Sequence, residues 1–178
     1  MLLVCGGLGW LIHDIREQEA VVKMIEELNG SVQFGEQSFL GRMGVVRSLF
    51  GEHAFAKVYF VRFGPETTNA HIVQLKKLKG LQSLSLHHNQ VSDLSPLAGM
   101  SELTMLDLYD IPVSDLTPLA GLTGLTWLDL GGTQVSDLSP LATLANLQQL
   151  YLTNTPASDE EVDQLQQALP NCNITRQR

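Results

Sequence analysis

Positive charge is missing from almost the whole second half of this 178-residue chain. No Lys or Arg occurs between Lys79 and Arg176, and residues 78–178 hold eleven acidic side chains against three basic ones. Residues 1–77 are balanced, with eight of each sign, so the net charge of -8 belongs to the second half. A surface without cations cannot neutralise phosphates, which argues against nucleic acid and anionic lipid as partners of that half.

Cysteines and catalytic motifs are also scarce. The two cysteines, Cys5 and Cys172, are too few for a disulfide framework and lack the spacing of metal ligands. The chain has no P-loop, no G-x-G-x-x-G after a strand, no H-E-x-x-H and no G-x-S-x-G. These absences favour a protein that is not an enzyme, with no catalytic residues and no cofactor expected.

The longest uncharged apolar stretch, MLLVCGGLGWLIH at the start, is too short to span a bilayer. A helix of that length falls short of the ~30 Å hydrocarbon core, and the stretch lacks the basic region and cleavage site of a signal peptide. We interpret residues 1–13 as the end of an N-terminal membrane anchor whose start lies upstream, with a buried first helix as the alternative. The anchor predicts a membrane-anchored or extracytoplasmic protein, although a cytoplasmic location stays open.

The chain does contain one eight-residue motif three times, with a single substitution. VSDLSPLA begins at Val91, VSDLTPLA at Val113 and VSDLSPLA again at Val135, in steps of 22 residues. Four units with leucines at the first, fourth and sixth positions accompany it: LQSLSL, LTMLDL, LTWLDL and LQQLYL. Steps of similar size reach VYFVRF before them and LPNCNI after them, so the repeats run from Val58 to Ile174. A fixed period of this length predicts a stack of structural units.

Each unit combines a strand with a return crossing. In TWLDLG, Leu128 and Leu130 point to one face of a strand, while Trp127 and Asp129 point to the other. One such strand cannot bury its leucines alone, but stacked copies form a continuous apolar core. The chain must then turn, cross the far side and return parallel.

This pattern resembles the leucine-rich repeat family, whose signature is L-x-x-L-x-L-x-x-N-x-L. The crossing segments, such as SDLSPLAGMSEL, resemble the internalin-like subclass of bacteria. The resemblance implies an α/β solenoid with a short curved parallel sheet and a convex side of short helical turns and helices. The family's asparagine is present at Asn89 but replaced by Ile111, Thr133 and Thr155. A threonine hydroxyl partly substitutes for it, whereas we expect packing alone to hold the turn at Ile111.

The non-repeating residues 14–57 predict an N-terminal α/β cap, because the terminal unit of a solenoid would otherwise expose its core. The cap is predicted to contain a helix ending at Gly30, a strand SVQF and a second helix LGRMGVVRSLF; the apolar face of the first helix comprises Ile15, Val22, Ile25 and Leu28. Residues 58–178 then form the solenoid with a closing strand. Within it, TTNAHIVQLKKL and SDEEVDQLQQAL predict helices, the latter with Ser158 and Glu161 as a capping box.

The outward positions that do not repeat are the candidate binding site. Aromatic side chains on a solvent face have no role in the core, and they are enriched at binding hot spots. Gly131 and Gly132 are expected to leave a notch between Tyr109 and Thr153. The predicted binding residues on the concave face are Trp127, Tyr109, Tyr151, Asp107, Asp129, Met105 and His87.

A metal or enzymatic site is the least favoured alternative. His87 and His88 lie beside Asp107 and Asp110 of the next strand, but no third ligand joins either pair, and two ligands do not hold zinc firmly. We therefore predict no metal. The expected function is a non-catalytic, monomeric interaction module whose protein or peptide partner carries a basic, partly apolar patch. A purely structural spacer or scaffold is the other alternative.

Overall fold

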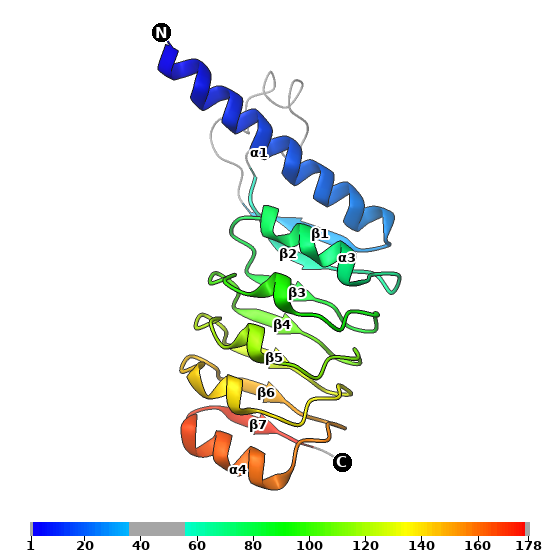
Figure 1. Cartoon of the computed structure of the whole chain (residues 1–178), viewed down its shortest axis with the longest axis vertical. Coiled ribbons are helices and arrows are strands. Elements are labelled where there is room, and N and C mark those ends of the chain that lie inside the picture. The colour runs from blue at the N-terminus through cyan, green and yellow to red at the C-terminus, as the bar shows by residue number, and fades with distance from the viewer. Residues whose placement is uncertain (1, 36–55, 177–178) are drawn as a thin grey trace.

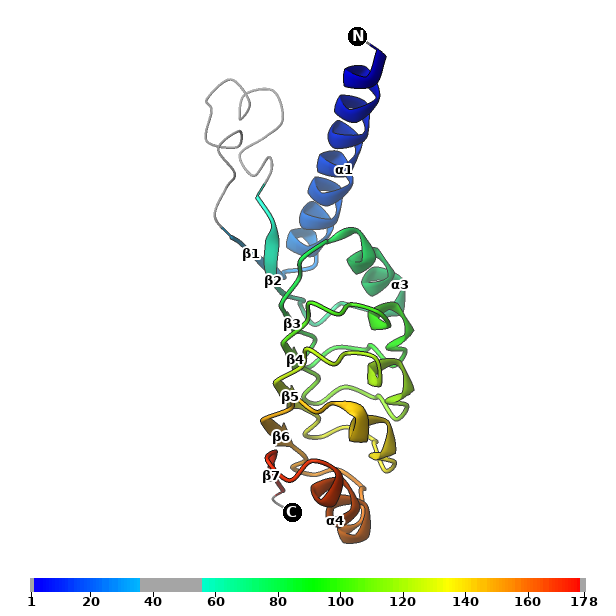
Figure 2. The ribbon, with the colours of Figure 1, turned by 90° about the vertical axis from the view of Figure 1, so that its left-hand side faces the viewer.

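The computed structural model describes residues 2–35 and 56–176, and the side chains from residue 12 onward within the first helix. Seven strands form one sheet in chain order, with β1 antiparallel to β2 and every later pair parallel. The strands are β1 (Ser31–Phe34), β2 (Val58–Arg62), β3 (Ser83–Ser85), β4 (Met105–Asp107), β5 (Trp127–Asp129), β6 (Gln149–Tyr151) and β7 (Asn173–Thr175). Figures 1 and 2 show them stacked along one side of an elongated solenoid, with the crossings on the other side.

The predicted register is confirmed on both faces of the strands. Leu106 pairs with Leu128, and Trp127 pairs with Met105 on one side and Gln149 on the other. The inward leucines of successive strands are fully buried in one continuous cluster that runs from the first helix to Cys172. This uninterrupted core is what a stack of units, each unable to bury its own strand, requires.

The crossings repeat one hydrogen-bonding device. In three consecutive units an aspartate carboxylate accepts the backbone N–H two residues later at 2.8 Å; the pairs are Asp93 with Ser95, Asp115 with Thr117 and Asp137 with Ser139. Hydrogen bonds from the hydroxyls of Thr117 and Ser139 lower the pKa of Asp115 and Asp137, and these backbone N–H bonds lower it further. Short 3₁₀ helices follow, each with proline near its start: Ser95–Leu97, Thr117–Leu119 and Ser139–Thr143. Proline suits this position because its fixed φ is already helical and its missing N–H is not needed.

The turns after the strands differ as the sequence predicts. Asn89 accepts the N–H of Val91 at 3.0 Å, whereas the hydroxyls of Thr133 and Thr155 donate to the carbonyls of Leu130 and Leu152, at 2.6 and 3.0 Å. Ile111, at the same position in the second turn, is 2% exposed and packs into the core. Packing therefore replaces the side-chain hydrogen bond there.

One position in each of these turns adopts the left-handed conformation. His88, Asp110 and Asn154 have φ of 54°, 54° and 56°, and the equivalent Gly132 has φ of 70°. Residues other than glycine, asparagine and aspartate rarely adopt this backbone conformation, because their Cβ atom crowds the backbone. The unit geometry thus imposes the turn on whichever residue occupies the position.

The N-terminal helix α1 (Leu2–Glu27) covers the open end of the stack with its second half. Val21 and Ile25 belong to the buried cluster that continues into the first repeat, and Ile15 is buried as well. Val22, expected on this face, is partly buried and packs against the same cluster. Ion pairs from Glu17 to Lys77 and from Asp14 to Lys79 add to the contact. The strand predicted at SVQF is confirmed as β1, and the helix predicted at LGRMGVVRSLF lies outside the described residues.

The first half of α1 extends beyond the stack in both views (Figures 1 and 2). The helix is continuous across residue 13, so the segment interpreted as an anchor and the segment interpreted as a cap belong to one element. None of the helices in the described ranges is long and apolar enough to cross a membrane.

The C-terminal unit ends in helix α4 (Asp159–Ala168) followed by β7. Ser158 caps α4 by accepting the N–H of Glu161, as predicted. The other half of the predicted capping box is wrong, because the carboxylate of Glu161 accepts the N–H of Leu138 in the preceding unit instead. Cys172 is buried as expected, which raises the pKa of its thiol. The helix predicted in the first unit is short, with α3 (Asn69–Ile72) continuing as the 3₁₀ helix Val73–Lys77.

Candidate functional site

The solvent side of the sheet, called the sheet face below, carries two rows of outward side chains. The parallel register places equivalent residues of neighbouring strands side by side. The first row is Phe60, Ser83, Met105, Trp127 and Gln149, and the second is Arg62, Ser85, Asp107, Asp129 and Tyr151. The sequence-predicted residues Trp127, Met105, Asp107, Asp129 and Tyr151 are therefore on one surface.

A hollow of ≈ 220 Å³ lies on this face above β3. Its position follows from side-chain size, because Ser83 and Ser85 are short whereas their neighbours on β2 and β4 are long. Phe60 and Arg62 line it from one side, and Met105, Asp107 and Trp127 line it from the other. The hollow is therefore largely apolar, with a cation at one edge and a carboxylate at the opposite edge.

The aromatic residues separate into two groups. Trp127 packs against Tyr151 of the next strand, with ring centroids 5.6 Å apart and planes tilted by 50°. Tyr109 follows β4 and contacts His88 edge-on, with the centroids 5.3 Å apart. The notch expected at Gly131 is filled by Tyr109, since a Cβ atom on Gly131 would lie 2.9 Å from the tyrosine ring. Glycine is needed there to admit the ring.

Asp107 is held by its own protein through both carboxylate oxygens. One oxygen, Oδ1, accepts the N–H of Tyr109 at 3.1 Å. The other lies 2.9 Å from the Ser85 hydroxyl and 3.0 Å from Nδ1 of His87. Asp107 therefore holds the side chain of His87 and the backbone of Tyr109 in place beside the strand. This structural role cannot be inferred from the sequence position of Asp107.

Asp129, at the same position of the next unit, is held by one oxygen. Its Oδ1 accepts the N–H of Gly131 at 2.8 Å. Burial raises the pKa of this carboxyl, the nearby charge of Asp107 raises it further, and the hydrogen bond from Gly131 offsets part of the rise. A carboxylate that is partly removed from water and incompletely hydrogen-bonded gains from a cationic neighbour.

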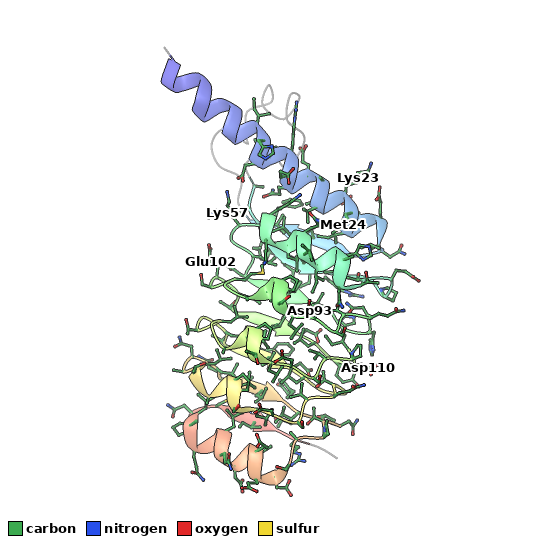
Figure 3. The ribbon with its side chains drawn as sticks, in the orientation of Figure 1. Lys23, Met24, Lys57, Asp93, Glu102 and Asp110 are labelled. Atoms are coloured by element: carbon green, nitrogen blue, oxygen red, sulfur yellow. The ribbon has the colours of Figure 1, made fainter. Side chains whose placement is uncertain are left out.

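The histidines form two separate pairs with aspartates. Nδ1 of His88 lies 2.9 Å from Asp110, beside the 3.0 Å contact of His87 with Asp107. Asp110 lies at the edge of the stack opposite Lys57 and Glu102 (Figure 3). Within residues 2–35 and 56–176, no group of three or more His, Cys, Asp or Glu residues could hold a metal ion.

Ser85, His87 and Asp107 are the residue types of a nucleophilic triad, but their arrangement is different. Ser85 Oγ and Asp107 Oδ2 both contact the same ring nitrogen, Nδ1 of His87, at 2.7 and 3.0 Å. A catalytic histidine takes the serine proton with one nitrogen while the acid holds the other. The present cluster joins a strand to its turn and does not activate the serine.

The regular register and the repeated leucine pattern agree with a comparison against protein-family models. A model described as Leucine Rich repeats (2 copies) matches residues 79–121 and 123–167. The chain belongs to the leucine-rich repeat family.

Solved structures share this fold. Internalin C2 from Listeria monocytogenes is 24% identical with a TM-score of 0.51, over 76% of this chain and 81% of that chain. The ectodomain of the receptor kinase SOBIR1 from Arabidopsis thaliana is 19% identical with a TM-score of 0.60, over 90% and 91%. A chain of the Drosophila melanogaster SNF/U2A' complex is 18% identical with a TM-score of 0.50, over 65% and 71%. No curated protein sequence shows a significant match.

Sequence reasoning missed two residues of this leucine-rich repeat surface, Phe60 and Arg62. The signal that could have found them was present, because β2 aligns with β3 after a step of 23 residues, which makes Phe60 equivalent to Ser83 and Arg62 to Ser85. The residues predicted from the sequence all follow β2, so they include neither the strand that supplies one side of the hollow nor its cation, Arg62.

Proposed function

We propose that the protein is a non-catalytic interaction module that binds a protein or peptide on the sheet face. The observation that carries this proposal is the hollow beside the Trp127–Tyr151 pair. Aromatic side chains on a rigid strand bury a large apolar area at little ordering cost, because the strand is already fixed. Leucine-rich repeats are typically interaction folds, and the Drosophila chain was solved as part of a complex.

The partner is proposed to present a basic, partly apolar patch. Trp127, Tyr151 and Met105 supply the apolar contact, and Asp129 supplies a carboxylate with one oxygen that no described residue contacts through a hydrogen bond. Tyr109 and His87 are proposed to contact the partner at the edge of the sheet face where the strands end. Asp107 acts mainly by holding His87 and Tyr109 in place. A monomeric state and a membrane-anchored or extracytoplasmic location stay predictions.

A capture experiment from the source cell tests the proposal. Immobilised wild-type protein and a Trp127→Ala variant are compared, with Val73→Ala as a control that removes an exposed apolar side chain away from the sheet face. A partner on the sheet face should lose about 2 kcal/mol or more of binding free energy with Trp127→Ala and little with Val73→Ala. A partner that ignores Trp127→Ala but responds to convex-side variants would refute the assignment. The absence of any specific partner would favour the spacer function.

A further inference from the structure

We propose that the sheet face selects an extended peptide with an acidic and a basic residue four positions apart and a large apolar residue midway between them. The inference rests on the proposed function, because it specifies the ligand of the same surface. Three groups on three parts of the face carry it: a cation on β2, the hollow above β3 and a carboxylate on β5.

Arg62 would bind the acidic residue. Its side chain is exposed on the sheet face at the edge of the hollow, and no hydrogen bond or ion pair of the guanidinium occurs within the described residues. The sequence supplies no Lys or Arg to the strands β3 to β6. An arginine presents a planar fork of N–H donors that matches a carboxylate. An acidic side chain that crosses this face therefore has a defined place to bind.

The hollow would receive the apolar residue. Its volume, ≈ 220 Å³, is below the roughly 300–1,000 Å³ of pockets that enclose small-molecule ligands, so it suits one large side chain. Phe60, Met105 and Trp127 provide apolar contacts, and Met105 is among the most exposed large hydrophobic residues of the described chain. Burying a side chain there would also cover Met105.

Asp129 would bind the basic residue, and Asp107 would not. Both oxygens of Asp107 are already hydrogen-bonded to Ser85, His87 and the N–H of Tyr109. Asp129 uses Oδ1 alone, for Gly131. Along the second row, the charged groups are therefore a cation on β2, a carboxylate on β4 with both oxygens hydrogen-bonded, and a carboxylate on β5 with one oxygen that the described residues leave free to bind a ligand.

The spacing of these groups sets the spacing in the peptide. Arg62 and Asp129 are in the same row and three strands apart, which corresponds to roughly 14 Å at ~4.8 Å per strand. An extended peptide that crosses the strands advances ~3.4 Å per residue, so it covers this distance in about four residues. Alternate residues of an extended chain point the same way, so the first, third and fifth side chains all face the sheet.

Selection from a display library of random linear peptides tests the inference. The wild-type protein is compared with Arg62→Glu, Asp129→Lys and Asp129→Asn, the last of which keeps an oxygen for Gly131. Lys76→Glu and Asp163→Lys are matched controls, because they make the same charge changes at exposed positions on the 3₁₀ helix Val73–Lys77 and on α4. Thermal unfolding checks that each variant is folded before selection.

The wild-type protein should enrich peptides with the acidic, apolar and basic order. Peptides selected by Arg62→Glu should carry a basic residue in place of the acidic one, with the other two positions unchanged. Peptides selected by Asp129→Lys should carry an acidic residue in place of the basic one. Asp129→Asn should abolish the basic preference alone. Affinity of a wild-type-selected peptide should fall roughly tenfold or more with each charge swap and remain unchanged in the controls.

Three outcomes would overturn the inference in distinguishable ways. Peptides that depend on Trp127 but lack the charge order, or whose charges ignore both swaps, would refute the inference and leave the proposed function standing. A library that yields no Trp127-dependent peptide would refute the inference, and the capture experiment would then decide whether a folded protein binds the face. Sedimentation that shows a dimer broken by Arg62→Glu would assign the face to a second copy of the chain and would also refute the inference.

Discussion

The two faces of the same strands follow opposite rules. The inward positions Leu84, Leu106, Leu128 and Leu150 are identical and fully buried, and each contacts a copy of itself. The outward positions one residue earlier are Ser83, Met105, Trp127 and Gln149, which differ in size and polarity. The uniform inward positions thus build the buried core of this protein, while the differing outward positions give each strand its own side chains on the sheet face. The following predictions test that division.

The largest effect should come from exposing the inward face at the end of the stack. In the fragment 58–178, Val61 and Phe63 would lose Val21 and Ile25 of α1, which belong to the same buried cluster. An apolar end surface of this kind promotes association, so the fragment should aggregate. Sedimentation and light scattering measure this. A monomeric fragment that unfolds cooperatively would show that the N-terminal segment is not a cap.

Next in size is a change at one inward position. Leu106 and Met105 are adjacent on β4 and similar in volume, but their exposed fractions are 0% and 45%. Leu106→Ala should lower the free energy of unfolding by about 2–5 kcal/mol, since it leaves a cavity in the packed row. Met105→Ala should lower it by less than about 1 kcal/mol. Urea unfolding compares the two, and equal losses would refute the division between the faces.

A smaller effect is expected in the turns that join the faces. Thr133→Val keeps the shape of the side chain but removes the hydroxyl that donates to the Leu130 carbonyl at 2.6 Å. The free energy of unfolding should fall by about 1 kcal/mol. Ile111 fills the equivalent position without a hydroxyl, so Ile111→Val provides a control in which no hydrogen bond is lost. If Thr133→Val costs nothing by urea unfolding, packing alone holds both turns.

The smallest effect concerns the pH dependence of Asp129. Burial raises the pKa of this carboxyl in the folded protein above its ordinary value. The folded state then holds the proton more tightly than the unfolded state, so Asp129 lowers the stability as pH rises through the folded pKa. Asp129→Asn should remove this part of the decline and leave the protein slightly more stable at neutral pH. Urea unfolding at acidic and neutral pH measures the difference, and a variant that declines as the wild type does would contradict it.

The sequence predicts the solenoid well because its leucines repeat with one period and leave a single register. The same alignment identifies the outward residues of β3 to β6 correctly, including Trp127 and Tyr151. Arg62 was omitted although β2 belongs to the same register. No such period covers the helix α1, where Val21 is buried more deeply than the expected Val22. A period identifies which residues share a surface and does not identify what each of them contacts.

The chemistry of the site depends on contacts that a repeat pattern does not contain. Asp107 and Asp129 are equivalent in sequence, but Asp107 is hydrogen-bonded to Ser85 and His87, whereas no histidine or serine among the described residues forms a hydrogen bond with Asp129. The hollow arises from two short side chains beside longer ones, and the predicted notch fails because the Tyr109 ring turns toward Gly131. Side-chain size and direction decide these features one residue at a time.

The constant pairing register of the strands has a consequence for how this protein can change in length. Because β2 to β6 pair in the same register, a tandem duplication of residues 103–124 would insert one strand without disturbing the pairing of the others. The distance between the two ends of the stack would increase by ~4.8 Å, and the distance between Arg62 and Asp129 would increase equally. Under the inference above, such a variant would select a longer peptide in which the acidic and basic residues lie farther apart.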